Sequence, residues 1–493
     1  MTSAPKEQRT KPSPPDATFV WTSRHVIVLT VLCLGHILET IDMTVVNVAL
    51  PRIKSDLAFS EGDLSWVVNA YTVTFGGFLL LCGRAGDLLG RRRVFIGGLV
   101  LFTVASLLAG LAGNAGTLVG ARALQGLAAA FIGPMTLAML TSTFPEGPPR
   151  NKAIGLWGML SGVSAAVGLL VGGVFVDGPG WEWIFWLNIP LGVVLVLATL
   201  RYLDADRPAR RFHRFDLPGA VTVTGGIGLL AYAIVQTHDH GWGSGRTIGL
   251  FAAALVLIGY FTVHEARVAK EPLMDLSLLK IRSVSSANVV QALTNSGMFV
   301  MFYLATLYQQ NVLHYSPIKT GLAYVPMTLL LVAFARVGPM LMPKFGVRNI
   351  VFAGAMISAI GLLLFSRVSP DGSFLVDVLV PSLFLGVGVA LTFIPTTVAA
   401  VSGVPKTQAG LVSGLVNVSR TVGGALGLAV VSTLAANHSA GLLKSGAVKA
   451  DALTEGFQLG FLISAGLLAF AGITALALFP KPGASAGPGA ARH

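Results

Sequence analysis

The fold of this chain is decided by the stretch Gly83-Arg84-Ala85-Gly86-Asp87-Leu88-Leu89-Gly90-Arg91-Arg92-Arg93, which separates two long apolar runs. Its glycines permit two helices to approach closely, and Asp87 has arginine partners within reach. A tight turn of this composition can latch two helical bundles together. The alternative is a basic loop that only fixes topology and carries a neutralising acid, and the glycine spacing argues against it. We therefore expect a gating motif that comprises Gly83, Asp87, Gly90, Arg91 and Arg92.

The composition places the chain in the membrane class. Hydrophobic types make up 54% of its 493 residues and charged types only 11%. A helix of about 20 apolar residues spans a bilayer, and only helices and closed barrels satisfy their own backbone in lipid. The long uninterrupted apolar runs exclude a barrel, so we expect an all-α integral membrane protein of the cell membrane.

The net charge of +12 does not indicate nucleic-acid binding, because the basic residues form short clusters between apolar runs instead of lining one face. Such clusters are typical of topology signals. Cys33 and Cys82 lie inside apolar runs, where a free thiol behaves as a small hydrophobe, so we expect no disulfide framework.

The apolar runs predict fourteen membrane spans. They begin near His25, Leu64, Val94, Thr117, Ala153, Trp183, Leu217, Thr247, Ser286, Gly321, Asn349, Phe374, Gly410 and Phe457. An even number puts both termini on one side of the membrane. With both termini in the cytoplasm, most of the 34 Lys and Arg fall in cytoplasmic segments, as the positive-inside rule requires, and the gating motif is cytoplasmic too. The basic residues that lie within spans are Arg122, Arg336 and Arg420.

The second half of the chain repeats the first at an offset of 256 residues, which matches Gly90 to Gly346 and Gly168 to Gly424. This predicts two six-helix bundles with two extra helices between them. The expected segments are a cytoplasmic tail over 1–24, a bundle over 25–202, a cytoplasmic linker over 203–216, two extra helices over 217–264, a second cytoplasmic linker over 265–285, a bundle over 286–480 and a cytoplasmic tail over 481–493.

Two carboxyl groups lie in the first predicted span, where each costs about 2.5–3.5 kcal/mol to insert. Glu39 and Asp42 are three apart on one helical face, with His36 one turn earlier. Two nearby carboxyls in apolar surroundings disfavour their charged forms, so we expect Glu39 and Asp42 to bind and release protons. The alternatives are that Asp42 faces the outer headgroups and that His36 is a packed polar group and no proton relay.

Other polar residues of the spans predict a cavity. Arg122 is always charged, so it must pair with a carboxylate, backbone carbonyls or water, or else act as an interhelical clamp near the cytoplasmic end. The ninth span carries a polar stripe at spacings of three and four, which should face either a cavity or neighbouring helices. Packing and substrate contact are both open for this stripe. The expected cavity residues are Asn69, Asn288, Gln291, Asn295 and Arg420.

Four segments resemble motifs of the major facilitator superfamily. The stretch over 83–93 is similar to its signature loop, and residues 42–51 (DMTVVNVALP) look like the first-helix motif of its fourteen-helix drug:proton antiporter branch. Residues 118–126 (LVGARALQG) resemble the intramembrane arginine motif, and residues 180–190 (GWEWIFWLNIP) the motif that begins the sixth helix. The resemblance covers essentially the whole chain. It implies a major facilitator fold of 14 transmembrane helices and a place for Arg122 in the proton-coupling machinery.

The chain departs from this pattern at two points. The antiporter motif of the fifth helix has Gly-Pro before a glycine pair, whereas here Leu169 follows Gly168, so the proline bend is missing. Pro343 stands where the repeat would place a second Asp87, so the inner latch is one-sided. Small residues still permit close packing of the fifth helix, and the expected packing and antiport motif comprises Gly158, Gly168, Gly172 and Gly173.

By resemblance we expect a proton-driven secondary transporter that exports lipophilic drugs, antibiotics or related small molecules by alternating access. The alternative is a major facilitator proton symporter or uniporter for uptake of a small organic solute, which Leu169 favours. We do not expect an enzyme, because no loop is long enough for a catalytic domain and His264-Glu265-Ala266-Arg267-Val268 lacks the second histidine of a zinc protease motif. We expect no cofactor, no metal and no nucleic acid; the expected partners of this monomer are a small lipophilic substrate, protons and the lipid bilayer.

Overall fold

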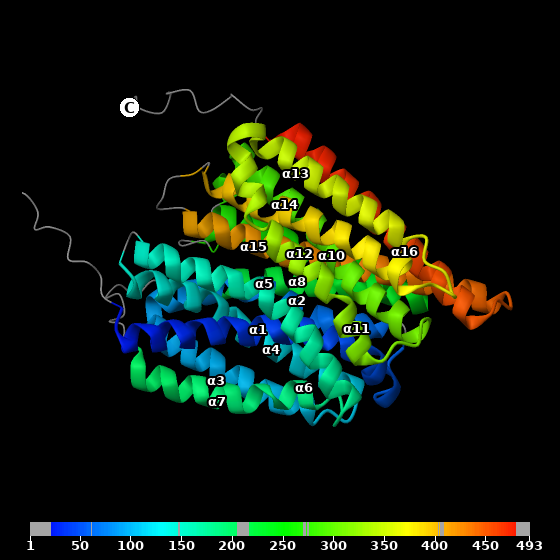
Figure 1. The fold of residues 1–493 in the computed structure, drawn as a ribbon, viewed down its shortest axis with the longest axis horizontal. Coiled ribbons are helices and arrows are strands. Elements are labelled where there is room, and N and C mark those ends of the chain that lie inside the picture. The colour runs from blue at the N-terminus through cyan, green and yellow to red at the C-terminus, as the bar shows by residue number, and fades with distance from the viewer. Residues whose placement is uncertain are drawn as a thin grey trace, which may run out of the picture.

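The structure, a computed structural model, describes residues 21–60, 62–145, 148–204, 216–269, 273, 276–402, 404 and 409–479. In these ranges every regular element is a helix, and no strand occurs (Figure 1). Twelve helices of these ranges are long and apolar enough to cross a membrane. The chain is therefore an all-helical, multi-pass membrane protein. Most of the two predicted tails and of the linker over 203–216 lies outside the described residues.

The first half of the chain forms a bundle of antiparallel helices. Apolar runs give these helices their length, and polar side chains set some of their ends. Thr22 caps the first helix by accepting a hydrogen bond from the His25 amide, and Asn114 caps the fourth by accepting one from the Thr117 amide at 2.9 Å. The helices are α1 (Ser23–Asp56), α2 (Trp66–Leu89), α3 (Arg91–Gly110), α4 (Ala115–Thr143), α5 (Pro148–Asp177), α6 (Trp183–Trp186) and α7 (Asn188–Tyr202).

The second half forms a similar bundle. The predicted span that begins near Gly321 is interrupted at Tyr324 and at Ala335 and Arg336, but the backbone angles of these residues stay helical. The next predicted span, near Asn349, begins just after Gly346, whose non-helical backbone separates two helices within Val337–Phe365. The helices are α10 (Arg282–Asn311), α11 (Pro317–Ala323), α12 (Val325–Phe334), α13 (Val337–Phe365), α14 (Val380–Ser402), α15 (Ala409–Lys444) and α16 (Lys449–Leu478).

The two halves share a backbone feature at the predicted repeat offset. Gly90 ends α2 with a φ of 95°, and Gly346 kinks α13 with a φ of 74°. Residues with a side chain rarely adopt such angles, so glycine is required at both tight turns. The predicted equivalence of Gly90 and Gly346 is therefore supported by geometry as well as by sequence.

A helical hairpin lies between the two halves in the sequence. Asp216 begins it by accepting a hydrogen bond from the Gly219 amide at 3.0 Å, and its Oδ1 lies 2.8 Å from Nε2 of His264 at the far end. Burial raises the pKa of Asp216, but hydrogen bonds with Glu265, the Gly219 amide and His264 outweigh burial and hold this pKa below its ordinary value. The hairpin consists of α8 (Leu217–His240) and α9 (Gly245–Val263).

Helix α8 covers one of the two sides along which the halves meet. It packs against α2 of the first half and α15 of the second. Thr224 of α8 occupies the space that a side chain at Gly77 of α2 would fill, and Ala231 of α8 shares an apolar cluster with Ala429 of α15. The opposite side, between α5 and the α11–α13 region, has no such cover among the described residues.

The halves share a large apolar cluster at one end, and they also meet along α2 and α15, where Val73 and Ala425 belong to one small cluster. One cluster combines residues from both halves, such as Val45 to Ile53 of α1 and Val300 to Val312 of α10. Two further clusters each belong to one half and include the opposite ends of the same helices, from Val28 of α1 and from Val284 of α10. We call the joined end the closed end and the other, where α1 and α10 begin, the open end. In Figure 1 the open end lies on the left, where α1 begins.

Backbone groups also join the halves at the closed end, beside the apolar side chains of the shared cluster. The Ile318 amide donates to Asp177 at 2.9 Å, and Gln310 Nε2 donates to the Val48 carbonyl oxygen at 2.8 Å. A Cβ at Gly173 of α5 would lie 2.5 Å from Cα of Ile318, and one at Gly321 would lie 2.5 Å from the Leu169 carbonyl oxygen. Only glycine leaves room for this approach of α5 and α11.

We predict that Gly173→Ala opens the closed end. The added methyl group meets backbone, which cannot rotate away, and such overpacking costs about 1–3 kcal/mol in the joined state only. Spin labels at Pro179→Cys and Lys319→Cys, with both native cysteines changed to serine, should show a longer distance population in the variant.

Gly259→Ala on α9 is the matched control, because a Cβ there meets nothing within 4 Å. An unchanged distance distribution in Gly173→Ala would contradict the backbone contact as the lock of this end.

Candidate functional site

The centre of the first half holds a buried ion pair. Arg122 of α4 pairs through Nη1 with Oδ2 of Asp42 on α1, and both residues are fully buried. The alternative in which Asp42 faces the headgroups is therefore wrong. Arg122 also donates from Nε to the Val67 carbonyl oxygen at 2.9 Å, and its guanidinium lies 4.6 Å from the centre of the Tyr71 ring. A charge in an apolar span needs such compensation.

Amides complete the hydrogen bonding of Asp42. Its Oδ1 accepts from Gln125 Nε2 at 3.0 Å and from Asn188 Nδ2 at 2.9 Å. The same two amides donate to the Ser106 hydroxyl oxygen at 2.9 Å and 3.4 Å. Gln125 Oε1 in turn accepts from Arg122 at 2.9 Å. This network, which we call the Asp42 network, joins α1, α3, α4 and α7.

Sequence reasoning missed the three neutral members of the Asp42 network. Gln125 lies one turn from Arg122 in the fourth-helix motif, and Asn188 lies in the motif that begins the sixth span, but the motifs alone did not predict a role for either residue. The feature that could have indicated both residues is an amide within a span, close to an intramembrane charge. Ser106 stands alone in an apolar run, and nothing in its sequence surroundings marks it.

A second titratable pair lies one turn earlier on α1. His36 Nδ1 is 2.7 Å from Oε1 of Glu39, and the His36 ring stacks on Trp157 of α5 with centroids 4.1 Å apart. Glu39 is 6% exposed, and its Oε2 is buried without a hydrogen-bond partner among the described residues. The Glu39 carbonyl oxygen accepts from the Tyr71 hydroxyl at 3.2 Å, so this pair adjoins the Asp42 network. His36 is more than a lone packed histidine, since it contacts a carboxyl group directly.

Arg420 of α15 connects the second half to Glu39. Its guanidinium lies 4.9 Å from the centre of the Phe393 ring and acts electrostatically on Glu39 across the boundary between the halves. Asn295 Nδ2 donates to the Arg420 carbonyl oxygen at 2.9 Å. Of the predicted cavity residues, Arg420 is thus brought close to the acidic group on α1, and Asn295 supports the helix that carries it.

The remaining predicted cavity residues divide into two groups. Asn288 accepts from the Ser419 hydroxyl at 2.7 Å, and Gln291 Nε2 donates to the Phe393 carbonyl oxygen at 2.9 Å, so both tie α10 to its neighbours. These contacts favour packing for that part of the stripe. Gln291 Oε1 and both amide atoms of Asn69 are buried without a partner among the described residues. Such groups are costly in apolar surroundings and are candidates for contact with substrate or water.

The predicted gating motif lies at the open end, and its described contacts stay within the first half. Arg91 donates to the Ala138 carbonyl oxygen of α4 at 3.1 Å, and Arg92 donates to the Leu200 carbonyl oxygen of α7 at 2.5 Å. Gly83 lies near Pro134, with 3.7 Å between a Cβ placed there and the proline. The Asp87 side chain lies outside the described part.

The predicted packing glycines of α5 face two different helices. A side chain at Gly168 would meet Thr44 and Ile41 of α1, and a Cβ at Gly172 would lie 2.8 Å from the Val45 carbonyl oxygen of α1. Gly173 instead meets α11, as described above. The surroundings of Gly158 lie outside the described part.

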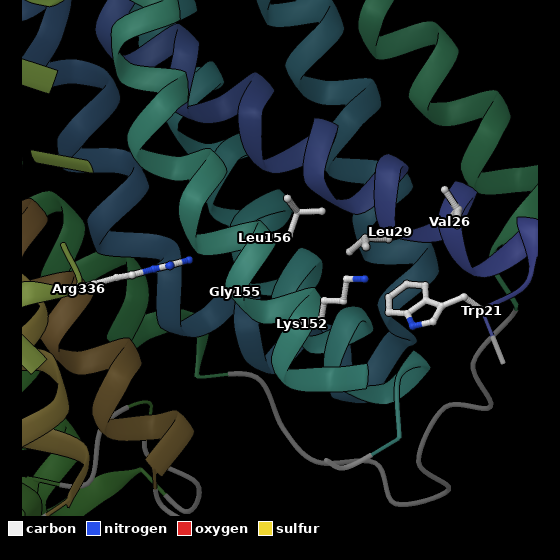
Figure 2. A pocket seen from close by; sticks show the side chains of 7 residues that line it. All are labelled: Trp21, Val26, Leu29, Lys152, Gly155, Leu156 and Arg336. Carbon is white, nitrogen blue, oxygen red and sulfur yellow. The ribbon is translucent and has the colours of Figure 1, made fainter. Parts of the chain in front are cut away.

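A cavity of about 670 Å³ lies at the open end, between the halves. Its walls come from the start of α1, the start of α5 and the turn between α12 and α13 (Figure 2). The described residues hold no group of three or more His, Cys, Asp or Glu that could bind a metal ion. The site is therefore a set of buried charges and amides, and none of its residues lines this cavity.

We predict that Arg122→Ala strongly destabilises the protein. It leaves the Asp42 carboxylate buried without its cation, which costs about 3–5 kcal/mol. The double variant Asp42→Asn with Arg122→Gln removes both charges and should be less destabilised than Arg122→Ala. Thermal unfolding of the purified protein measures both.

The exposed pair of Arg52 and Asp56, 3.2 Å apart, supplies the control. Arg52→Ala should cost about 0–1 kcal/mol. Equal melting temperatures for Arg122→Ala and Arg52→Ala would contradict a stabilising role for the buried pair.

Comparisons with known proteins agree with this architecture. The chain is 39% identical to the cephamycin export protein CmcT of Amycolatopsis lactamdurans, over 85% of this chain and 87% of the relative. It is 35% identical to the puromycin resistance protein pur8 of Streptomyces alboniger, over 91% and 90%. It is 32% identical to the tetracenomycin C resistance and export protein of Streptomyces glaucescens, over 89% and 83%.

The fold also matches solved transporters of low sequence identity. The peptide transporter PepTSo aligns with a TM-score of 0.67 at 16% identity, over 92% of this chain and 97% of that structure. The nucleoside transporter NupG aligns with a TM-score of 0.65 at 12% identity, over 93% and 100%. The model of the Major Facilitator Superfamily matches residues 32–428, and the chain therefore belongs to this family of membrane transporters.

Proposed function

We propose that the chain exports antibiotics or related lipophilic compounds across the cell membrane by alternating access, driven by protons. The observation that carries the proposal is the arrangement of the two halves, which are joined at the closed end and separate at the open end around buried carboxyl groups. Rocking of two such bundles about a site between them is the ordinary mechanism of secondary transporters.

The substrate class rests on the relatives. Their names describe export of cephamycin and of tetracenomycin C, and resistance to puromycin. These relatives align with most of this chain, so the same kind of cargo is the best-supported proposal.

Proton coupling rests on Glu39 and Asp42. Asp42 is held by Arg122 and two amides, whereas Glu39 has one oxygen without a partner and faces Arg420 of the other half. In this scheme Glu39 takes up a proton or a cationic group of the substrate, and the Asp42 network, including Arg122, responds to that change. One charge that crosses 100 mV releases about 2.3 kcal/mol, enough for a roughly fifty-fold outward gradient.

The proposal includes fourteen spans and cytoplasmic termini. Twelve spans qualify by length and composition, and α2 and α5 bring the number to fourteen. These two helices have 24 and 30 residues and pack among the twelve. The positive-inside bias of the loops supports the orientation. The domain boundaries given above follow from it. The open end then faces the cytoplasm, and the structure represents the inward-facing state.

In the outward-facing state, the gating motif would meet the second half. Gly83, Gly90 and the arginines lie at the open end, where the halves must come together for the cavity to close. We propose that Asp87, Arg91 and Arg92 then exchange their contacts within the first half for contacts across the boundary.

We predict that Asp42→Asn and Glu39→Gln abolish proton-driven accumulation of substrate in everted vesicles. Neither amide can release a proton, so the gradient that drives roughly fifty-fold accumulation in the wild type should no longer do so. Puromycin, tetracenomycin C and a cephamycin are the compounds to test, because the relatives are named for them.

Asp451→Asn, which changes an exposed acid at the start of α16, is the matched control. Proton-dependent transport that survives both substitutions would remove Glu39 and Asp42 from the coupling. The pH inside the vesicles separates export from the uptake symport that Leu169 favours, because antiport raises the internal pH on addition of substrate and symport lowers it.

A further inference from the structure

The lining of the cavity at the open end includes two cations that have no role in the proposed transport mechanism. The cavity lies on the side of the molecule that α8 leaves uncovered, between α1 and α5 of the first half and the α12–α13 turn of the second. Its wall is apolar apart from two cations. The lining residues are Trp21, Val26, Leu29, Lys152, Gly155, Leu156 and Arg336.

Both cations of the wall, Lys152 and Arg336, are exposed. Neither Lys152 nor Arg336 has a carboxylate partner among the described residues, and Lys152 Nζ lies 5.5 Å from the centre of the Trp21 ring. Arg336 sits in the turn between two apolar helices, α12 and α13. In Figure 2 its side chain extends from the second half toward the helix that carries Lys152 and Gly155. A guanidinium in such surroundings is stabilised by a bound anion.

The wall of the cavity between Lys152 and Arg336 has room for an apolar chain. A Cβ at Gly155 would meet nothing within 4 Å. Val26 and Leu156 are 51% and 38% exposed, so the cavity continues onto the apolar flank that the bilayer covers, while Leu29 is buried behind them. An occupant that fits both features has an anionic head and an apolar tail.

We propose that this cavity binds an anionic phospholipid, with the headgroup phosphate between Lys152 and Arg336 and an acyl chain along Val26, Leu29 and Leu156. Charge complementarity and the continuity of the wall with the lipid-facing flank favour a lipid over a soluble anion. Basic pockets between membrane helices on the cytoplasmic side bind such headgroups. The lipid proposal rests on the proposed orientation of the chain, which puts the site at the inner leaflet. It does not depend on the proposed cargo.

The lipid joins the two halves at the end where the protein itself does not. Lys152 belongs to the first half and Arg336 to the second, so a phosphate bound by both would bridge the halves. Closure of the open end changes the separation of these cations. Anionic lipid therefore stabilises the state in which this end is open.

Native mass spectrometry of the full chain tests the site, with phosphatidylglycerol as the anionic probe and phosphatidylcholine of the same chains as the neutral one. The wild type should prefer phosphatidylglycerol. Lys152→Gln and Arg336→Gln should each weaken its binding about fivefold, since one cation contributes about 1 kcal/mol, and the double variant should lose the preference. Lys449→Gln, an exposed cation at the start of α16, should change nothing.

Gly155→Leu fills the cavity while both cations remain, and should also weaken binding of phosphatidylglycerol; the melting temperature of each variant shows whether it folds. Equal binding of the two lipids by the wild type, or unchanged binding by the folded double variant, would overturn the proposal. Displacement of phosphatidylglycerol by glycerol 3-phosphate would show that a soluble phosphate suffices and would overturn the lipid as the occupant.

Discussion

The buried ion pair of Asp42 and Arg122 is the constraint on which the first half of the molecule depends. A carboxylate and a guanidinium in an apolar interior each need a partner and hydrogen bonds for their remaining atoms, or they cost several kcal/mol. Amides from two further positions supply those bonds, so four helices must keep their relative places for the charges to stay compensated. The network therefore holds these four helices together, on one side of the boundary between the first half and the second.

That boundary is uneven, and the proposed alternating access depends on this unevenness. The halves share one apolar cluster at the closed end and have separate clusters at the open end, while α8 bridges one side along α2 and α15. Rotation about the closed end is the motion that leaves each cluster intact. Glu39 of α1 and Arg420 of α15 lie on the two sides of the same boundary, so in the proposed mechanism the charge state of Glu39 bears on the contact between the halves.

The sequence was sufficient to predict the helices and the buried acidic residues, but it did not predict the hydrogen-bond partners of those acids. Apolar runs fixed the helical regions because lipid permits little else, and two carboxyls in a span had to be buried and compensated. Gln125, Asn188 and Ser106 were missed since their role arises only when four helices pack together.

The polar stripe of the ninth span illustrates the same limit. Its spacing placed Asn288 and Gln291 on one face, yet which face meets a cavity and which meets another helix depends on the second half as a whole. Both residues turned out to bond to neighbouring helices, and only Gln291 keeps a buried oxygen without a partner among the described residues.

Part of the contact between the halves at the closed end is made by main-chain atoms that meet at Gly173 and Gly321, beside the side chains of the shared apolar cluster. Main-chain atoms are the same in every sequence, so this part of the contact is insulated from changes in most side chains. Residues elsewhere can then diverge without upsetting it. A protein built this way can acquire new specificities by ordinary mutation, provided that these few glycines are kept.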